Sequence, residues 1–403
     1  MSEGPLSHLK VLDLSRVLAG PFAAQILGDL GAEVIKVERP ASGDDTRHWG
    51  PPWHESPDGS LREAAYYLSA NRNKRSVAID FRTAAGADLV RRLARRCDVV
   101  IENYRVGTLA RHGLDYPSLV AENAGLVYCS VTGFGQDGPW AARPGYDFLI
   151  QGLSGLMSIT GDPDGPPMKV GVAVADLTTG MQAVIAILAA LAEREQSGRG
   201  QYIDMALFDT CVGWLANQAM NYLVSGRAPM RRGNAHPNIV PYQDFPTADR
   251  RIIICVGNEG QFARLAEVLG RPDWPTDPRF SINEARVRHR EILVGLIAER
   301  LMEHPADHWL AALEKAAVPS GPIQDIAEAF AHPQAIHRGL RVEVAHPELG
   351  AVATVANPIR LSRTPVSYRL APPRLGEHTD EILRAAGLAA DEIAELRAKG
   401  VLG

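Results

Sequence analysis

Short apolar runs alternate with helical patterns over the first 135 residues of the chain. Five runs of aliphatic residues without helical spacing are typical of buried strands: 9–14, 32–38, 75–80, 98–103 and 126–135. Residues 20–31 and 84–96 show helical spacing instead, and Pro21 stands in the first turn of the earlier helix, where proline is tolerated. This alternation predicts a parallel sheet with crossover helices, a Rossmann-like pattern. No G-x-G-x-x-G follows the first strand, so a dinucleotide site of the usual kind is disfavoured.

The remaining sequence predicts a second, smaller α/β unit between two linkers. A long helix is expected from Leu177 to about Ser197, followed by a strand and a second long helix that reaches about Val224. The turn-rich segment 225–238 predicts a linker, and a second α/β unit follows over about 238–325. After a further linker near 330, strand-like and helical segments complete the chain.

Composition indicates an ordinary globular protein with at least two domains. The chain has 403 residues, of which 46% are hydrophobic and 22% charged. Forty-two basic and 47 acidic residues give a net charge of −5, which provides no broad field for nucleic acid. The segment 183–192 is the longest apolar run and is too short to cross a bilayer, so no membrane partner is expected.

The cysteines and the N-terminal sequence bear on compartment and on metal binding. Cys97, Cys129, Cys211 and Cys255 are far apart and show no C-x-x-C spacing, so neither a disulfide framework nor a metal site is indicated. The first ten residues lack the basic and apolar regions of a signal peptide. A cytoplasmic location is therefore expected.

Asp176 stands where the chain passes from an apolar run into the helix expected at Leu177. An Asp directly before a helix is a favoured N-cap, because its side-chain oxygen accepts a hydrogen bond from an unpaired backbone N–H. Local sequence therefore explains this carboxylate without any catalytic role.

Seven ordered stretches between residue 9 and about residue 390 resemble the family III CoA-transferases, the group of formyl-CoA transferase and, on a related fold, α-methylacyl-CoA racemase. They are "VLDLSRVLAGPFAAQILGDLGAEVIKVERP", "NRNKRSVAIDFR", "VIENYRVGTLARHGL", "ADLTTGMQAV", "SGRGQYIDMALFD", "GNEGQF" and "LGEHTDEIL". The resemblance implies an α/β fold with a large Rossmann-like domain built from both chain ends, here 1–224 and 331–403. It also implies a smaller central α/β domain at 225–330 with flanking linkers, and a homodimer of two interlocked rings.

The resemblance places the family's catalytic aspartate at Asp176. A carboxylate suits this chemistry, because it is ionised at neutral pH and a thioester is reactive enough for a weak oxygen nucleophile. The dipole of a helix beginning at Leu177 would favour the ionised form, so cap and nucleophile are compatible in one residue. Coenzyme A and its thioesters are then substrates, with no permanently bound cofactor.

The resemblance also implies a set of CoA contacts. Arginines suit the diphosphate and the 3′-phosphate of CoA. A single surface arginine is usually only solvated, so the assignment depends on all of these residues matching the family's CoA contacts together. The residues are Leu18, Ala19, Arg39, Ile79, Asp80, Phe81, Arg82, Asn103, Tyr104, Arg105, Arg111, Arg143 and Tyr146.

Residues 256–262 resemble the family's glycine loop, which approaches the acyl group. The expected substrate-side residues there are Gly257, Asn258, Glu259, Gly260 and Gln261, with Asn258 and Glu259 standing where formyl-CoA transferase has glycines. Without the resemblance, a plain turn explains the same residues.

The stretches "GNAHPNIVPYQDFPTAD" and "VPSGPI" resemble the succinyl-CoA-dependent dicarboxylate branch of the family. That branch implies succinyl-CoA as donor and a C4 to C6 dicarboxylate such as glutarate as acceptor. The second carboxylate of the acceptor needs a cationic or multiply donating partner, because an unpaired buried charge is costly. Arg47 is the first candidate and His236 the second, although either residue could be structural.

Two alternative functions differ in the residues that they need. An acyl-CoA racemase on the same fold needs two bases, and Tyr146 stands at the position of the racemase histidine, where a phenol is a poor base at neutral pH. A non-catalytic acyl-CoA-binding protein would have no need of Asp176. The sequence therefore favours a CoA-transferase.

Overall fold

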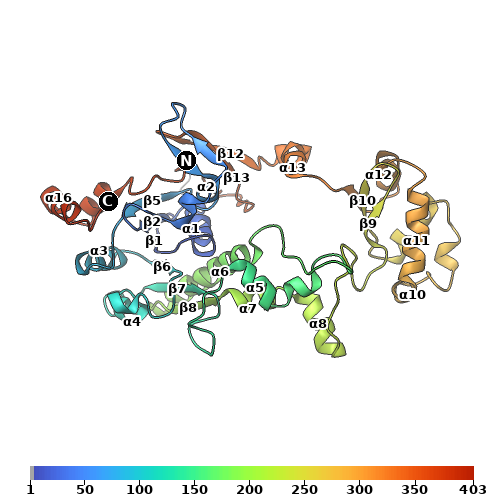
Figure 1. Cartoon of the computed structure of the whole chain (residues 1–403), viewed down its shortest axis with the longest axis horizontal. Coiled ribbons are helices and arrows are strands. Elements are labelled where there is room, and N and C mark those ends of the chain that lie inside the picture. The colour runs from blue at the N-terminus through green and yellow to red at the C-terminus, as the bar shows by residue number, and fades with distance from the viewer. Residues whose placement is uncertain (1–3) are drawn as a thin grey trace. The chain divides into compact units, whose positions relative to one another are not determined.

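The computed structural model describes residues 4–403 and divides the chain into two compact units (Figure 1). Unit 1 consists of the chain up to Leu156, Val170–Met220 and Gln334–Gly403. Unit 2 consists of Met157–Lys169 and Asn221–Pro333. The small domain was expected at 225–330, and unit 2 takes in the additional segment Met157–Lys169, which carries no apolar periodicity that would indicate this.

Unit 1 contains a six-stranded sheet in which all neighbouring strands run parallel, as the sequence predicted. The strands lie in the order β5-β2-β1-β6-β7-β8, which is the 3-2-1-4-5-6 order of a doubly wound Rossmann fold. Their bounds are β1 Lys10–Asp13, β2 Glu33–Glu38, β5 Lys74–Ala78, β6 Val99–Glu102, β7 Val127–Thr132 and β8 Tyr202–Ala206.

Helices cover this sheet, and two hairpins extend unit 1. The helices are α1 Ala19–Asp29, α2 Ala65–Leu68, α3 Ala84–Ala94, α4 Tyr116–Val120, α5 Asp147–Leu153, α6 Val174–Ser197, α7 Leu207–Gly213, α14 Pro333–His337, α15 Thr379–Ala385 and α16 Ala390–Ala398, with 3-10 turns η1 Asp45–His48 and η2 Ala110–His112. The 3-10 turn η3 Leu156–Ile159 begins at the last residue of a unit 1 segment and continues into unit 2. The antiparallel hairpins are β3 Trp53–Glu55 with β4 Arg62–Ala64, and β12 Arg341–His346 with β13 Gly350–Val355.

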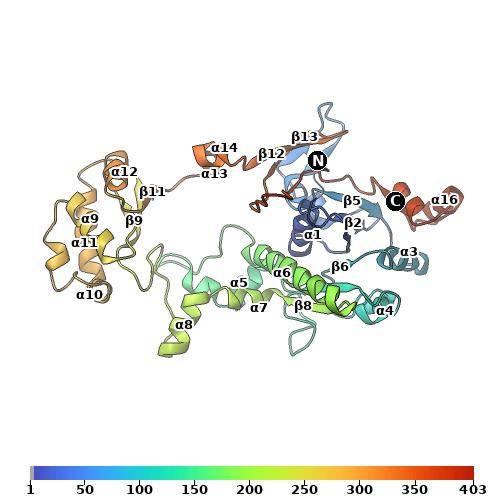
Figure 2. The ribbon, with the colours of Figure 1, turned by 180° about the vertical axis from the view of Figure 1, so that it is seen from behind.

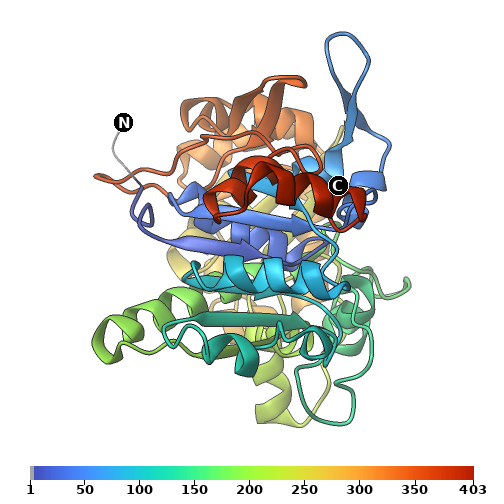
Figure 3. The same ribbon diagram turned by 90° about the vertical axis from the view of Figure 1, so that its left-hand side faces the viewer.

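The C-terminal segment returns to the sheet and completes its core. Side chains of α3, α15 and α16 form one buried cluster with alternate residues of the central strands, among them Leu12 and Ile35. The backbone N–H of Asp80 donates to the carbonyl of Val401, which ties the end of the chain to the segment after β5. Figure 3 shows the red C-terminal helices beside the blue strands.

Helix α6 packs against α1 on unit 1 (Figure 2). A Cβ atom at Gly180 would lie 2.7 Å from the carbonyl oxygen of Ala19, so the close approach of the two helices requires glycine. Within residues 4–403, α6 is the one helix long and apolar enough to span a membrane, and 56% of its apolar window is buried inside the protein. That burial accounts for its apolar composition.

Two helix predictions were wrong in their bounds. Helix α6 begins at Val174 and not at Leu177. The single long helix expected up to Val224 is two helices, α7 and α8 Ala216–Ser225, and Ala216 has a φ of +43° where they meet. A left-handed backbone at a non-glycine residue interrupts the helical hydrogen bonds, and apolar periodicity alone does not reveal it.

Unit 2 has its own sheet and core. Strand β10 Arg251–Cys255 pairs antiparallel with β9 Tyr242–Pro246 and with β11 Ser320–Pro322. Its helices are α9 Glu259–Val268, α10 Asn283–Arg288, α11 Arg290–Leu301, α12 Ala306–Lys315 and α13 Ile326–Ala331, with the 3-10 turn η4 Trp274–Thr276. Buried side chains such as Phe245, Phe262 and Trp274 form a core separate from that of unit 1.

Buried charges lie close to the central strands of unit 1. The Nζ atom of Lys74 donates to Asp13 Oδ2 at 2.8 Å, to the carbonyl of Pro21 at 2.8 Å and to Asn71 Oδ1 at 2.9 Å. Burial lowers the pKa of Lys74 to about 8, although Asp13 opposes that shift. Burial alone would raise the pKa of Asp13, but the charges of Lys74 and Lys36 hold it below its usual value.

We expect Lys74→Met to destabilise unit 1 by about 3 to 5 kcal/mol, because Asp13 would remain buried without its ion-pair partner and with only the charge of Lys36 nearby. Urea unfolding at pH 7 measures this loss. The matched control is Lys10→Met, whose ammonium pairs with Glu33 at 3.4 Å on the surface and should contribute less than about 1 kcal/mol. Equal losses in the two variants would show that the buried pair has no special importance.

Candidate active site

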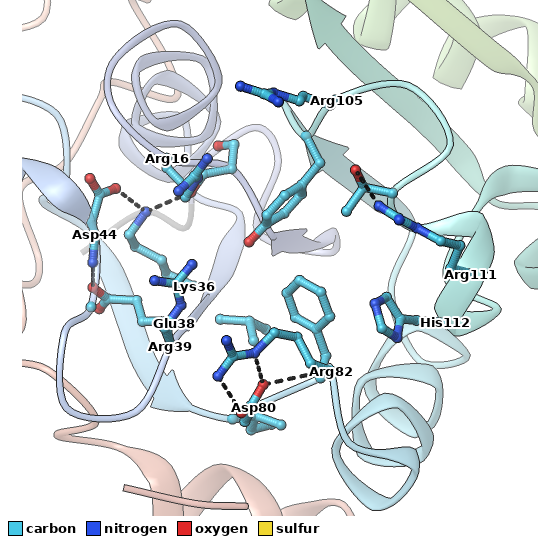
Figure 4. Close-up of a pocket in the computed structure, with 17 residues that line it drawn as sticks. Arg16, Lys36, Glu38, Arg39, Asp44, Asp80, Arg82, Arg105, Arg111 and His112 are labelled. Atoms are coloured by element: carbon cyan, nitrogen blue, oxygen red, sulfur yellow. Dashed lines mark hydrogen bonds and ion pairs between the residues drawn. The ribbon is translucent and has the colours of Figure 1, made fainter. Parts of the chain in front are cut away.

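The carboxyl ends of β1, β2, β5 and β6 surround a cavity of about 540 Å³, here called the basic pocket (Figure 4). Ligands of open α/β sheets bind in the crevice at these ends, where the strand order reverses. Six cationic side chains line the cavity: Arg16, Lys36, Arg39, Arg82, Arg105 and Arg111. The local charge is thus far more positive than the net charge of the chain.

Some of these cations are neutralised within the protein and others are not. Lys36 pairs with Asp44 at 2.9 Å, and Arg82 pairs with Asp80 at 2.7 Å. Within residues 4–403, Arg39, Arg105 and Arg111 form no ion pair with a carboxylate, and all three are exposed. These three guanidinium groups are therefore free to bind an anionic ligand.

One wall of the basic pocket is aromatic. The ring of Phe81 meets Tyr104 edge to face at a centroid distance of 5.3 Å, and His112 at 5.6 Å. An aromatic ring of a ligand could pack against this wall, next to the arginines that have no ion pair.

A second cavity of about 440 Å³, here called the Asp176 pocket, adjoins the basic pocket and shares Arg16, Tyr104 and Arg105 with it. It is lined by the turn after β1, the segment after β6, the end of β7, residues 143–146 and Asp176. Strands β1 and β6 are the neighbours at which the strand order reverses. Because the two pockets share these three residues, they adjoin along the carboxyl edge of the sheet and lead from the basic pocket to Asp176.

The turn after β1 is held rigidly by polar contacts. Asn103 accepts a hydrogen bond from the backbone N–H of Arg16 at 2.8 Å and donates to the Arg16 carbonyl at 2.6 Å. Asp44 accepts from the backbone N–H of Val17 at 3.2 Å. Val17 has a φ of +70°, which is rare for a β-branched residue and persists only where surrounding contacts enforce it. The amide of Asn103 thus fixes the pocket wall.

Asp176 is the third residue of α6 and not its N-cap, so the predicted capping role was wrong. The N-cap position is Ala173, which has no side chain able to cap the helix. The carboxylate of Asp147, at the start of α5, accepts hydrogen bonds from the backbone N–H groups of Ala175 at 2.7 Å and Asp176 at 3.4 Å. A residue from another helix therefore caps α6, and the Asp176 side chain faces the pocket.

The environment of Asp176 disfavours its charged form. Burial, and secondly the charge of Asp147, raise the pKa of Asp176 to about 7. The sequence-based expectation of a fully ionised carboxylate therefore needs correction. The dipole of α6 favours ionisation, but burial and the like charge outweigh it.

The structure gathers the predicted CoA contacts into the two pockets, and their contact with CoA itself stays a prediction. The Asp176 pocket contains Leu18, Ala19, Asn103, Arg143 and Tyr146, the basic pocket contains Arg39, Ile79, Asp80, Phe81, Arg82 and Arg111, and Tyr104 and Arg105 line both.

Arg47 does not line the Asp176 pocket, and its guanidinium already has protein partners. It is 7% exposed and donates to Glu38, Glu63, Tyr67 and the carbonyl of Pro373. An acceptor carboxylate would have to displace these buried partners. The structure thus gives no support to the expected role of Arg47 at the substrate.

The other predicted substrate residue outside the glycine loop, His236, belongs to unit 2 and lies beside Tyr242, with a ring-centroid distance of 5.3 Å. Burial, and secondly the charge of Arg290, lower its pKa. The Nδ1 atom of His236 accepts a hydrogen bond from the backbone N–H of Asn238 at 3.1 Å.

The expected glycine loop is in large part the start of a helix. Asn258 is the N-cap of α9 and accepts from the backbone N–H of Gln261 at 2.9 Å, while Gln261 accepts from the N–H of Gly257 at 2.7 Å. Glu259 and Gly260 lie within the first turn. Asn258 stabilises this turn as a cap, which explains why the segment differs from a glycine-only loop.

Sequence reasoning missed four residues near Asp176. Arg16, Asp45 and Trp49 line its pocket, and Asp147 contacts its backbone. Arg16 lies inside the quoted stretch "LSRVLAGP", and Asp147 follows Tyr146 in "GYDFL", so both were next to residues already singled out. Asp45 and Trp49 flank Arg47, two residues away on either side, so they too stood close to a residue already singled out.

We expect Asp176→Asn to stabilise the protein at pH 8 and to leave stability unchanged at pH 4. A carboxyl whose pKa is raised on folding contributes stability below its unfolded pKa near 4, and that contribution is lost as the pH rises through about 7. The neutral amide suffers no such loss. Melting temperatures from pH 4 to pH 8 measure the difference, with the exposed Asp209→Asn as control. A difference from wild type that does not change with pH would contradict the raised pKa.

Comparison with known proteins identifies the family to which the chain belongs. The model of CoA-transferase family III matches residues 6–379. A succinate–glutarate CoA-transferase of Agrobacterium fabrum is 53% identical over 379 residues, which cover 94% of this chain and 95% of that protein. The human succinyl-CoA:glutarate CoA-transferase is 43% identical over 399 residues, covering 99% of this chain and 90% of that protein.

A solved structure shows the same fold. The crystal structure of a CAIB/BAIF family protein from Brucella suis superposes with a TM-score of 0.84 at 50% identity, covering 96% of this chain and all of that one. The family model spans most of the chain, and relatives above 40% identity cover nearly all of it. The chain therefore belongs to CoA-transferase family III and is an enzyme that transfers CoA.

Proposed function

We propose that this enzyme moves CoA from succinyl-CoA to glutarate through a thioester formed on Asp176. The names of the relatives at 53% and 43% identity support these two substrates. The observation that carries the mechanism is the position of Asp176 in a pocket that shares Arg16, Tyr104 and Arg105 with the basic pocket. A long anionic thioester has a continuous path along unit 1 to this carboxylate.

The basic pocket suits the nucleotide end of CoA. Its three arginines without an ion pair, Arg39, Arg105 and Arg111, offer forked donors to phosphate oxygens. The adenine ring has an aromatic wall available at Phe81 and Tyr104. The pantetheine arm then extends past Arg105 toward Asp176.

The first half-reaction needs no external acid or base. A carboxylate oxygen of Asp176 attacks the thioester carbon of succinyl-CoA, the C–S bond breaks, and a mixed anhydride and CoA thiolate form. The thiolate attacks the aspartyl carbonyl of the anhydride, the C–O bond to the succinyl group breaks, and succinate leaves. Asp176 now carries CoA as a thioester.

The second half-reaction reverses this order with the acceptor. A carboxylate of glutarate attacks the aspartyl thioester, giving a new anhydride and free thiolate. The thiolate attacks the glutaryl carbonyl, which releases glutaryl-CoA and restores the Asp176 carboxylate. No proton is gained or lost overall, which fits a site whose reactive group is a carboxylate alone.

The second carboxylate of a dicarboxylate acceptor needs a cation, and the Asp176 pocket has three. Arg16, Arg105 and Arg143 all line it. Arg16 pairs with the half-exposed Asp45 at 3.0 Å, and Arg143 lies over the ring of Trp140 at 4.1 Å. These partners are more exposed than those of Arg47, so an incoming carboxylate competes with them at lower cost.

The racemase alternative is disfavoured by the residue that replaces its histidine. The side chain of Tyr146 is largely exposed at the N-terminal end of α5. A racemase needs a base on each side of the substrate α-carbon, and a phenol supplies a poor one.

A cytoplasmic homodimer of interlocked chains is part of the same proposal. Unit 1 exposes large apolar side chains on the neighbouring helices α5, α6 and α7, including Phe148, Ile185 and Val212. Ile326 and Ile336 are exposed on short helices that follow unit 2's last strand. Exposed apolar groups of this size favour burial against a partner. The four cysteines are unpaired, in keeping with a reducing compartment.

We expect Asp176→Ala to abolish CoA transfer and formation of the covalent intermediate. After incubation with succinyl-CoA and rapid quenching, the wild-type chain should gain the mass of CoA less one water, and the variant should gain nothing. Intact mass spectrometry and a transfer assay measure both. Asp209→Ala, an exposed carboxylate on α7, is the control and should keep both the adduct and the activity. Transfer at the wild-type rate in the Asp176 variant would refute the mechanism.

We expect glutarate or a close C4 to C6 dicarboxylate to exceed formate, oxalate and carnitine-like acceptors at least about tenfold in kcat/KM, about 1.4 kcal/mol in the barrier. An acceptor without a second carboxylate at the right spacing leaves a pocket arginine without its partner. Side-by-side kinetics with succinyl-CoA as donor measure this preference. A monocarboxylate or zwitterion as the best acceptor would refute the dicarboxylate assignment and leave the transferase chemistry intact.

A further inference from the structure

Asp147 contacts the helix turn that carries Asp176. One carboxylate oxygen of Asp147 accepts hydrogen bonds from the backbone N–H groups of Ala175 at 2.7 Å and Asp176 at 3.4 Å. Its other oxygen accepts from Gln151 Nε2 at 2.7 Å. Because Ala173 cannot cap α6, Asp147 takes that role from α5. The charge of Asp147 therefore stands at the same helix terminus as Asp176.

We propose that Asp147 is a positioning residue that fixes the first turn of α6 and, by its negative charge, makes the Asp176 carboxylate a stronger nucleophile. The inference rests on the proposed role of Asp176 as nucleophile. Asp147 does not line the Asp176 pocket, so the proposed role acts on Asp176 and not on the substrate directly.

The like charge acts differently in the resting and the reacting enzyme. In the resting enzyme, burial and the charge of Asp147 raise the pKa of Asp176 to about 7, so the carboxylate is more basic than an ordinary aspartate. When Asp176 forms the anhydride or the thioester, its own charge disappears and the repulsion from Asp147 ends. An interaction that is relieved on the way to the transition state speeds the step.

The other groups around Asp176 do not replace this effect. Tyr66 on α2 is a neutral neighbour, because burial and, secondly, the charges of Asp176 and Asp147 raise its pKa to about 12. The pocket also contains Arg16, Arg105 and Arg143 as cations and Asp45 as an anion. Of the charged groups named here, Asp147 alone contributes to the shift at Asp176, after burial.

Hydrogen bonding and charge are separable at this position. Asp147→Asn keeps a side-chain oxygen that can accept from the α6 N–H groups but removes the charge. Asp147→Ala removes the charge and the acceptor oxygen together, and it serves as a second test of the charge if the amide packs poorly. Asp209→Asn removes one negative charge from an exposed residue of α7 that does not line the Asp176 pocket, and it is the matched control.

The experiment measures the rate of the covalent CoA adduct in a single turnover with succinyl-CoA, between pH 5.5 and pH 8.5, by quenched mass spectrometry. In wild type the rate should rise with a midpoint near pH 7. Both Asp147 variants should move this midpoint down by about one pH unit and lower the plateau rate by up to about tenfold. Asp209→Asn should follow the wild-type curve.

Each outcome separates this inference from the proposed function. An unchanged midpoint in both Asp147 variants overturns the inference, even if their melting temperatures fall, because Asp147 would then act as a cap only. If Asp176→Ala still forms the adduct, the proposed nucleophile is wrong, whatever the Asp147 variants do. Adduct formation that needs Asp176 and shifts with Asp147 supports both.

Discussion

The turn between β1 and α1 depends on one buried carboxylate. Asp44 accepts hydrogen bonds from Lys36 Nζ at 2.9 Å and from the backbone N–H of Val17 at 3.2 Å, and Lys36 in turn donates to the carbonyl of Ser15 at 2.9 Å. This set of contacts holds Val17 in a left-handed conformation at the point where the strand order of the sheet reverses. Because both pockets use the residues of this turn, their shape depends on the buried ion pair of Lys36 and Asp44.

Unit 1 uses buried charge in two opposite ways. Around β1 and β5, cation and anion are matched, as in the pair of Lys74 and Asp13, so that each buried group is compensated. At the start of α6, two carboxylates stand together without an ion-pair partner among the described residues. The first arrangement fixes the sheet edge, and the second gives the Asp176 carboxylate unfavourable electrostatics, which the proposed reaction would relieve. Such local destabilisation is tolerated where the surrounding structure is firmly held.

The contrast between Arg47 and Arg16 shows why residue type is a poor guide to role. Both are arginines in the segments between β1 and β3, and the charge of either would allow it to bind a substrate carboxylate. Arg47 stacks on the ring of Tyr67 at 3.7 Å and is enclosed by two glutamates. Arg16 lies between the two pockets with a half-exposed partner. The difference comes from the hairpin β3–β4, whose Glu63 reaches Arg47 and which left no signal in the sequence pattern.

The sequence by itself determined the alternation of strands and helices, the parallel sheet, the position of Asp176 at a helix start and, through ordered motifs, the family. These features depend on local apolar spacing or on long contiguous stretches, which a single chain displays directly. Only the tertiary structure decided that α6 begins at Val174, that Asp147 caps it from α5, and that burial raises the pKa of Asp176 to about 7. Those properties arise from groups 29 residues apart in the chain and from the exclusion of water between them, neither of which leaves a periodic trace in the sequence.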